Sequence, residues 1–209
     1  MTRKTALALG PGLSLNPETV RLVQQVVRKT PLPAVIDADG LGAFVGKPEI
    51  FRKKQKELIL TPHPGEMARL AGISVEEVQK ERLEVARGFA RDYEVILVLK
   101  GSRTVIADPG GEIFINPTGN PGMASGGTGD VLTGMIGGFL AQGLPPLEAA
   151  KLGVYLHGLA GDYAAFQKGE RGIAATDLVE LAPAVLNALA SGRGEIGNFS
   201  FPMGWEICY

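Results

Sequence analysis

Short apolar segments alternate with longer amphipathic stretches along most of the chain. Apolar positions at helical spacing predict helices at residues 16–28, 74–89, 130–142, 147–166 and 177–189. The apolar segments between them predict buried β-strands at residues 5–9, 34–37, 58–61 and 95–99. Strands that alternate with helices indicate a right-handed wound, mostly parallel sheet with helices on both faces. The predicted fold class is therefore α/β.

Local signals add detail to this pattern. Ser74 and Glu77 have the spacing of a capping box, which predicts a helix start. The turn sequence Asp-Pro-Gly-Gly between the apolar segments 104–107 and 112–115 predicts an antiparallel β-hairpin. We interpret the basic cluster in residues 49–57 as the solvent-facing side of a helix.

The domain organisation follows from length and composition. A chain of 209 residues with 45% hydrophobic and 21% charged residues is typical of a globular protein and excludes intrinsic disorder. We predict a single catalytic domain over residues 1–190 and an irregular or disordered tail over residues 191–209. The single cysteine, Cys208, excludes an internal disulfide framework.

Charge and hydropathy narrow the function classes. The net charge of −1 gives no electrostatic basis for binding nucleic acid or an anionic membrane. The first apolar run is too short for a signal peptide, and the longest one, residues 131–141, is too short to span a bilayer. We therefore expect a cytoplasmic protein with no nucleic-acid or membrane partner.

Glycine is over-represented. The chain contains 29 glycines, about twice the usual share. Concentrated glycine indicates loops whose backbone takes positive φ or closely approaches a ligand. Ligands of parallel α/β sheets bind beyond the carboxyl ends of the strands. We therefore expect one ligand-binding edge, formed by the loops at residues 10–12, 37–40, 62–66, 100–104 and 118–129.

The strongest chemical signal is the segment Asn-Pro-Gly-Met-Ala-Ser-Gly-Gly-Thr-Gly-Asp at residues 120–130, which leads directly into an apolar helix. Glycines allow successive N–H groups to point at a bound anion, and the helix dipole strengthens that anion hole. If the loop only bound a phosphate, the Asp130 carboxylate would repel it. An aspartate at this position is instead suited to act as a base, which takes a proton from a hydroxyl group as that group attacks a phosphoryl group. The alternative is a first-turn acid that stabilises the helix.

Other nucleotide-binding and catalytic motifs are missing from the sequence. It has no Walker A motif, no G-x-S-x-G and no H-E-x-x-H. The segment that begins at Gly10 is a G-x-G-x-x-G motif without its third glycine. A dinucleotide-binding fold of the usual type is therefore poorly supported.

Several motifs together resemble one family. The segment 120–130, the Thr-Pro-His-Pro-Gly-Glu-Met stretch at 61–67, the Lys-Gly-Ser-Arg-Thr stretch at 100–104 and the Tyr-Leu-His-Gly-Leu-Ala-Gly-Asp stretch at 155–162 are similar to those of the ADP/ATP-dependent NAD(P)H-hydrate dehydratases. These enzymes belong to the ribokinase-like superfamily. The resemblance runs from about residue 7 to residue 189. It implies a three-layer fold with a β-hairpin.

The resemblance also implies an activity. Family members are lyases that repair hydrated NADH and NADPH. They phosphorylate the ring hydroxyl group of the hydrate with ADP or ATP and then eliminate phosphate, which restores the cofactor. The co-substrate expected here is ADP, or ATP, with Mg²⁺. We also expect a homo-oligomer, specifically a tetramer.

Individual residues match the family's functional positions. Asp130 matches the catalytic aspartate, which also contacts the hydrate. Gly12 and His63 match contacts to the hydrated dinucleotide. The nucleotide-binding positions are Lys100, Gly101, Ser102, Arg103, Thr104 and Gly129, and we add Gly127 from the predicted anion hole.

Most of these residues also have a structural interpretation. Gly12 is equally well explained as a turn glycine. His63, fixed between two prolines, suits either a ligand contact or a local helix cap. Lys100 ends a buried strand, where it either meets a phosphate or extends its ammonium group to solvent. His157 lies on a predicted helix face and is interpreted as structural.

Three acids form a second group of candidates. Glu66 either reaches Mg²⁺ through water or is a first-turn helix acid. Asp37 and Asp39 end one strand at the ligand-binding edge, where neighbouring carboxylates influence each other's pKa and could contact the substrate. Asp39 is equally compatible with an Asx turn.

Family members usually begin earlier, with a glycine-rich strand–loop–helix section. We therefore expect this chain to lack that section and to expose a sheet edge that an oligomer would cover. Two alternative functions stay open. One is a superfamily kinase for a vitamin-type small molecule, and the other is a nucleotide-binding module without turnover.

Overall fold

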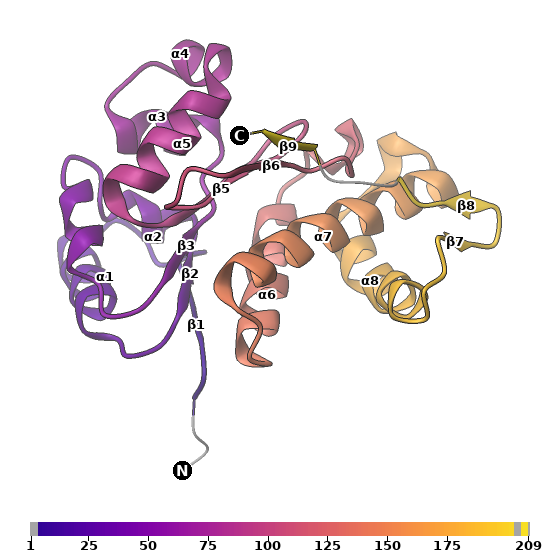
Figure 1. Cartoon of the computed structure of the whole chain (residues 1–209), viewed down its shortest axis with the longest axis horizontal. Coiled ribbons are helices and arrows are strands. Elements are labelled where there is room, and N and C mark those ends of the chain that lie inside the picture. Colours follow the sequence, from indigo (N-terminus) through magenta and orange to yellow (C-terminus); the bar gives the residue numbers. More distant parts are fainter. Residues whose placement is uncertain (1–3, 203–205, 209) are drawn as a thin grey trace.

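The computed structural model describes residues 4–202 and the backbone of residues 206–208. Its main sheet has the strand order β1-β2-β3-β4-β5-β6-β9 (Figure 1). The first four strands are parallel: β1 (Leu7–Leu9), β2 (Ala34–Ile36), β3 (Leu58–Leu60) and β4 (Ile96–Leu99). The other three are antiparallel: β5 (Val105–Ala107), β6 (Ile113–Ile115) and β9 (Glu206–Cys208). The predicted strands and the β-hairpin are confirmed.

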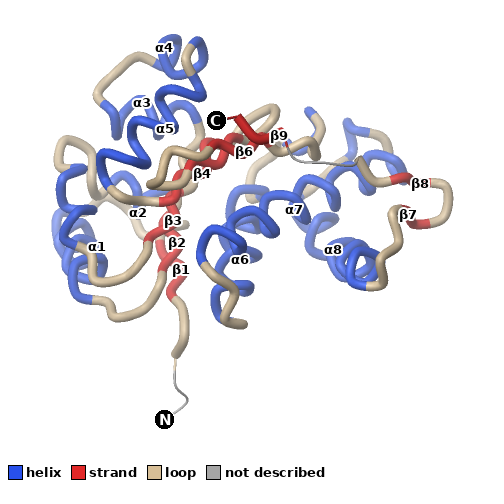
Figure 2. The backbone as a smooth tube through the Cα atoms, in the orientation of Figure 1, coloured by secondary structure: helices blue, strands red, loops and turns tan. Residues whose placement is uncertain are grey.

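Helices cover both faces of the sheet (Figure 2). One face carries α1 (Pro17–Lys29), α2 (Ala38–Gly42), α3 (Pro64–Ala71), α4 (Val75–Lys80), α5 (Arg82–Tyr93) and the 3₁₀ helix η1 (Pro48–Lys53). The opposite face carries α6 (Thr128–Ala141) and α7 (Pro146–Lys168), with α8 (Ala175–Ala190) packed on α7. Two further 3₁₀ helices are η2 (Pro121–Met123) and η3 (Glu170–Gly172). The predicted three-layer α/β architecture is confirmed.

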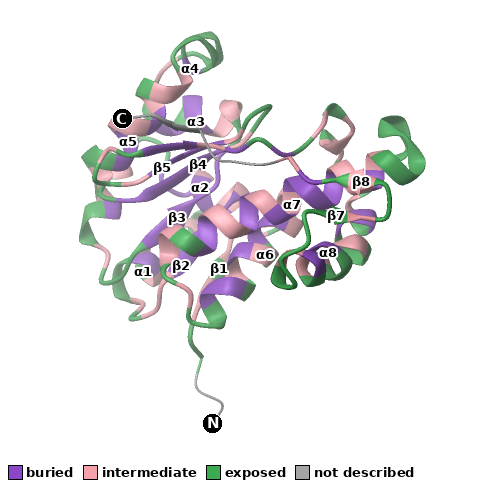
Figure 3. Cartoon of the chain, turned by 45° about the vertical axis from the view of Figure 1, so that its right-hand side comes forward, coloured by how far each residue is buried: buried purple, intermediate pink, exposed green. Residues whose placement is uncertain are grey.

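The core lies on both sides of the parallel strands (Figure 3). Ile36 and Leu97 face the layer formed by α1 to α5, whereas Val35 and Val98 face α6 and α7. Burial on both faces explains why these strands are continuous apolar runs without alternation. Burial on both faces also holds the ends of these strands in place, and the polar loops begin at those ends.

The helix predicted over residues 74–89 is in fact two helices. The Ser74–Glu77 capping box starts α4, as predicted, but Glu81 leaves helical geometry (φ −123°, ψ 41°) and separates α4 from α5. The hydrophobic pattern misses this break because Val78 and Val85, seven residues apart, satisfy helical spacing either way. The break places Arg82 at the start of a new helix.

The predicted helix over residues 49–57 is also shorter than expected. Only residues 48–53 form a helix, η1, which is of the 3₁₀ type and is anchored by the buried Phe51. Lys54 is already extended. Of the basic cluster, Arg52 and Lys53 are therefore in the helix, whereas Lys54 and Lys56 lie beyond its end.

The prediction of an irregular tail is wrong for its described part. Residues 195–200 form a second sheet, a hairpin of β7 (Glu195–Ile196) and β8 (Phe199–Ser200). Phe201 is buried in the core cluster that also contains residues of α6, α7 and α8, and the Tyr155 hydroxyl group donates to the Pro202 carbonyl at 2.8 Å. These contacts join positions far apart in sequence, so no local sequence pattern predicts them. Residues 203–205 and 209 of the predicted tail, and residues 1–3 of the predicted domain, lie outside the described residues.

Within the described part of the chain, no helix combines the length and the apolar character that a membrane span requires.

Candidate nucleotide and substrate site

The loops after the parallel strands meet at one edge, as predicted. Backbone hydrogen bonds join each loop to its neighbour: Asp37 N to Leu9 O at 3.1 Å, Thr61 N to Ile36 O at 3.1 Å, and Lys100 N to Pro62 O at 2.9 Å. The fifth loop reaches the same place, because a Cβ on Gly129 would lie 3.3 Å from Lys100 Nζ and 3.7 Å from Asp37 Oδ2.

A buried ion pair lies at the centre of this edge. Asp37 Oδ1 accepts a hydrogen bond from Lys100 Nζ at 2.7 Å, and Asp37 Oδ2 accepts one from Thr133 Oγ1 of α6 at 2.9 Å. Asp37 is only 1% exposed, and both of its carboxylate oxygens are bonded. Asp37 therefore fixes the Lys100 ammonium group beside the first turn of α6.

Asp39 has a different partner. Its Oδ2 accepts the Ser14 N–H at 2.8 Å, which ties the β1–α1 loop to α2. The two neighbouring carboxylates thus have separate sets of partners. Gly10 of the same loop must be glycine, because a Cβ there would lie 1.8 Å from the Asp37 carbonyl oxygen. Gly12 is exposed with φ +73° and has open space beside it, so its backbone angle accounts for the glycine.

His63 caps α3. Its Nδ1 accepts the N–H groups of Gly65 at 3.0 Å and Glu66 at 3.3 Å, while Glu66 Oε2 accepts the His63 N–H at 2.7 Å. An accepting Nδ1 carries no proton, so a neutral His63 ring presents Nε2–H as a donor. That side chain is 52% exposed, and Nε2 lies 3.6 Å from Glu66 Oε1. The local-cap interpretation is thus confirmed, and Nε2 stays accessible to a ligand.

Glu66 is a first-turn acid that also faces Lys100. Its Oε2 lies 3.7 Å from Lys100 Nζ, so the ammonium group lies between the carboxylates of Asp37 and Glu66. Among the described residues, no group of three or more His, Cys, Asp or Glu side chains is arranged to hold a metal ion.

The glycine-rich loop ends in an open helix start. Gly127 adopts the left-handed conformation (φ 89°) as the N-cap of α6. The Thr128 hydroxyl group contacts the carbonyls of Met123 and Ser125, both at 2.9 Å. Within the described residues, the N–H groups of Gly129 and Asp130 have no partner, as expected of the first turn of a helix. These two donors and the helix dipole have the arrangement that an anion hole requires.

Asp130 lies in that first turn with its side chain exposed. Its carboxylate forms no hydrogen bond or ion pair with the part of the chain that the structure describes. A helix-stabilising role does not require any contact, but an exposed and uncommitted carboxylate beside two free N–H donors is also what a base for phosphoryl transfer needs.

Side chains of α7 form hydrogen bonds with the glycine-rich loop that precedes α6. Asp162 accepts the Gly119 N–H at 2.8 Å and the Asn120 Nδ2–H at 3.0 Å. The buried His157 donates through Nε2 to the Thr128 carbonyl at 2.8 Å, and burial lowers the pKa of His157 to about 4. Contacts from residues 157 and 162 of α7 thus order the glycine-rich loop. The structural interpretation of His157 is confirmed.

The segment after β4 is a tight turn on the surface. Gly101 has φ +140°, and the Thr104 hydroxyl group donates to the Gly101 carbonyl at 3.1 Å. Ser102 and Arg103 are exposed beside a cavity of about 480 Å³. Sequence reasoning missed two residues at this edge, Thr133 and Arg82. Thr133 lies inside α6 and Arg82 is the first residue of α5, and neither composition nor spacing distinguishes them.

Comparisons with known proteins identify the fold and the family. The fold is that of the ribokinase-like proteins: a structure from Enterococcus faecalis of that superfamily matches with a TM-score of 0.72 and 31% identity, covering 90% of this chain and 63% of the other. The family model for NAD(P)H-hydrate dehydratases matches residues 1–184. The chain therefore belongs to the NAD(P)H-hydrate dehydratase family.

Individual relatives are similar over most of this chain but are longer. The bifunctional NAD(P)H-hydrate repair enzyme Nnr of Moorella thermoacetica is 53% identical over 88% of this chain and 34% of its own length. The ADP-dependent (S)-NAD(P)H-hydrate dehydratase of Bacillus subtilis is 40% identical over 86% of this chain and 63% of its own length. A crystal structure of the B. subtilis ADP/ATP-dependent enzyme, co-crystallised with ATP/Mg²⁺, matches with a TM-score of 0.79 and 37% identity, covering 90% of this chain and 66% of the other.

Proposed function

We propose that this chain catalyses the ADP-dependent dehydration of hydrated NADH and NADPH. Family membership and the activities for which the relatives are named support this proposal. The observation that carries it is the meeting of three groups at one edge: the unbonded N–H groups of Gly129 and Asp130, the Lys100 ammonium group, and the exposed Asp130 carboxylate.

The proposed reaction has two steps. In the first step, Asp130 takes the proton of the ring hydroxyl group. The hydroxyl oxygen attacks the β-phosphorus of ADP, and AMP leaves. The phosphate group then departs with the electron pair of its C–O bond, and a proton is lost from the neighbouring ring carbon, which restores the double bond. The N–H groups of Gly129 and Asp130 stabilise charge on the phosphoryl oxygens.

Lys100 supplies positive charge to the same phosphate. Its ammonium group has three donors, and the contact with Asp37 uses one of them. Asp37 contributes by holding Lys100 rather than by touching the substrate, because the Asp37 side chain is buried and fully bonded. The remaining nucleotide contacts are proposed for the turn at 101–104 and for Gly127.

The hydrated dinucleotide is proposed to bind across the loops that carry Gly12 and His63. The open space beside Gly12 and the exposed Nε2–H of His63 support this placement. A neutral imidazole donor at Nε2 suits a ribose or pyrophosphate oxygen. The Asp39 carboxylate shapes this loop through the Ser14 N–H.

A magnesium ion would fit this site only if the nucleotide phosphates supplied some of its ligands. Mg²⁺ is commonly bound through one or two carboxylates together with substrate phosphates. Glu66 is the residue that could reach such an ion, through water, because Asp37 is already bonded to Lys100 and Thr133. The ion would neutralise charge on the transferring phosphate.

We also propose a cytoplasmic homo-oligomer, specifically a tetramer. Strand β1 is the edge of the main sheet in the described part of the chain, and an edge strand presents unpaired N–H and C=O groups to a partner. The single cysteine fits a reducing compartment. Light scattering on the purified chain measures the oligomeric state.

The activity is tested by supplying either hydrated NADH or pyridoxal, each with ADP or ATP. Recovery of the reduced nicotinamide absorbance with release of phosphate is the expected result, with ADP as the better nucleotide. Phosphorylation of pyridoxal alone would instead identify a vitamin-type kinase. Binding of ADP by calorimetry without turnover of either compound would identify a nucleotide-binding module.

A further inference from the structure

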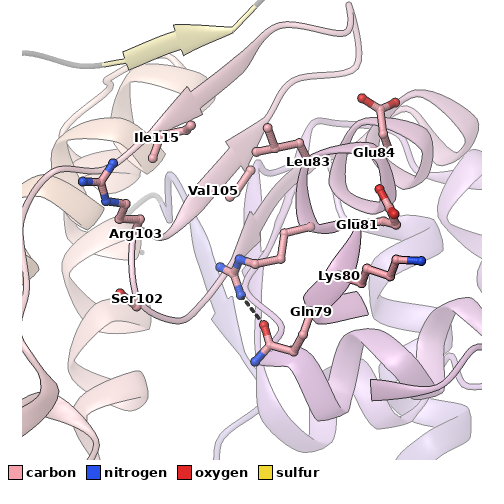
Figure 4. A pocket seen from close by; sticks show the side chains of 10 residues that line it. Gln79, Lys80, Glu81, Leu83, Glu84, Ser102, Arg103, Val105 and Ile115 are labelled. Carbon is pink, nitrogen blue, oxygen red and sulfur yellow. Dashed lines mark hydrogen bonds between the residues drawn. The ribbon is translucent and has the colours of Figure 1, made fainter. Parts of the chain in front are cut away.

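Arg82 makes an unusual set of contacts next to the proposed nucleotide site. Its Nη2 donates to the Leu99 carbonyl at 3.1 Å and to the Lys100 carbonyl at 3.4 Å. Its Nη1 donates to the Gln79 side-chain oxygen at 3.1 Å and reaches the Lys100 carbonyl at 3.5 Å. The hydrogen bond to Gln79 is drawn in Figure 4, on the wall opposite Ser102 and Arg103.

The guanidinium group of Arg82 is committed to backbone carbonyls. Among the described residues, no carboxylate lies within ion-pair distance of it. Its partial burial lowers the pKa of the Arg82 guanidinium, which still stays charged because its ordinary value is so high. The charge therefore serves to hold the chain at the end of β4.

The absence of a side chain at Gly101 leaves room for the Arg82 guanidinium group. A Cβ on Gly101 would lie 2.9 Å from Arg82 Nη1 and 3.2 Å from Nη2, and its φ of +140° disfavours any other residue. Lys100 is thus fixed at both ends. Arg82 holds its carbonyl from the α5 side of the sheet, and Asp37 holds its ammonium group beside α6.

We propose that Arg82 is the positioning residue of the nucleotide-binding turn. It sets the place of residues 100–104, so that Lys100 and the N–H groups of the turn face the nucleotide phosphates. This inference rests on the proposed function, because it assigns ADP to that turn. Arg82 itself touches no substrate.

The matched control is Arg87 on the same helix. Arg87 also donates from its guanidinium group to a backbone carbonyl, that of Gly111 at 3.1 Å, in the turn between β5 and β6. R87Q thus removes a similar arginine–carbonyl contact away from Lys100. R82K keeps the charge and the stem of Arg82, but a lysine cannot reproduce the planar fork that reaches several acceptors.

The test uses the full chain and two measurements, amide hydrogen exchange over residues 100–104 and calorimetric titration with ADP. We expect R82Q to speed exchange of this segment and to weaken ADP binding roughly ten-fold, as expected from losing hydrogen bonds to a charged group. R82K gives smaller changes in the same direction, and R87Q changes neither quantity. If R82Q does not fold, R82K decides with the same two measurements.

Unchanged exchange in R82Q, or equal changes in R82Q and R87Q, would overturn the inference. Faster exchange with unaltered ADP affinity would also overturn it, since the turn would then not serve the nucleotide. Failure of the wild-type chain to turn over the hydrate would refute the proposed activity without affecting these two results. Failure of the wild-type chain to bind ADP would refute both.

Discussion

At the scale of single residues, the ion pair between Asp37 and Lys100 organises the site. Breaking a buried ion pair by removing one partner typically costs 3–5 kcal/mol. Lys100 keeps 18% exposure of its side chain and has Glu66 nearby, which reduces the cost. We expect Asp37→Asn to lower the free energy of unfolding by about 2 kcal/mol, measured by urea denaturation.

The exposed Asp92, paired with Arg91, is the control, and Asp92→Asn should cost less than about 0.5 kcal/mol. Lys100→Met combined with Asp37→Asn should cost clearly less than the sum of the two single changes. Additive costs would mean that the two side chains are not coupled and that Asp37 does not hold Lys100.

A second residue-scale prediction concerns pH. The pKa of His157 is about 4 in the folded protein and about 6.5 when unfolded, so the unfolded chain binds the proton first as pH falls. The stability that neutral His157 contributes is therefore complete above pH 6.5 and is lost between pH 6.5 and 4. Between pH 7 and pH 5 we expect a loss of about 2 kcal/mol.

Urea denaturation at the two pH values measures this loss. His157→Gln, which cannot titrate but can still donate to the Thr128 carbonyl, should lose about 2 kcal/mol less over the same interval. The same pH dependence in both proteins would show that His157 is not the group responsible.

At the scale of elements, the start of α6 decides the binding chemistry. Gly129→Ala would place a Cβ 3.3 Å from Lys100 Nζ, the far end of a flexible side chain. The ammonium group can shift, and alanine favours the helix by roughly 0.5–1 kcal/mol, so the melting temperature should change little. ADP binding should weaken roughly ten-fold because the anion hole and Lys100 are both disturbed.

Gly134→Ala in the same helix is the control, because no heavy atom lies within 4 Å of its added Cβ. It should raise stability and leave ADP affinity unaltered in the same calorimetric titration. A Gly129→Ala variant that loses stability while binding ADP normally would indicate a purely structural loop.

The sequence predicted the parallel strands and the glycine-rich loop before α6 because both are local features. Strands buried on two faces are continuous apolar runs, and glycines before an apolar helix mark an anion hole. It did not predict the Arg82 contacts, the Thr133 hydrogen bond or the burial of Asp37. Each of these depends on contacts between residues that are far apart in sequence, so no rule based on sequence spacing predicts them.

At the scale of the whole molecule, the segment after α8 is attached to the core through Phe201. Phe201 is 5% exposed and belongs to the same core cluster as residues of α6 and α7, whereas Phe166 on α7 is 55% exposed. We expect Phe201→Ala to lower the free energy of unfolding by about 3–4 kcal/mol, as for other buried phenylalanines. Phe166→Ala, which contacts the Phe199 ring at the surface, should cost about 1 kcal/mol.

Chemical denaturation of the two variants compares these positions directly. Equal and small costs would show that the segment after α8 does not pack on the core, and the sequence-based prediction of an irregular tail would then be restored.

The central claim is that Asp130 acts as the base in phosphoryl transfer from ADP to the hydrated nicotinamide ring. The most direct measurement is the turnover of hydrated NADH with ADP by Asp130→Asn, alongside its ADP affinity. Glu148→Gln, which alters an exposed first-turn acid of α7, is the matched control. We predict a roughly 10²–10⁴-fold loss of turnover for Asp130→Asn with ADP still bound, and wild-type turnover for Glu148→Gln. Near-normal turnover by Asp130→Asn would contradict the account.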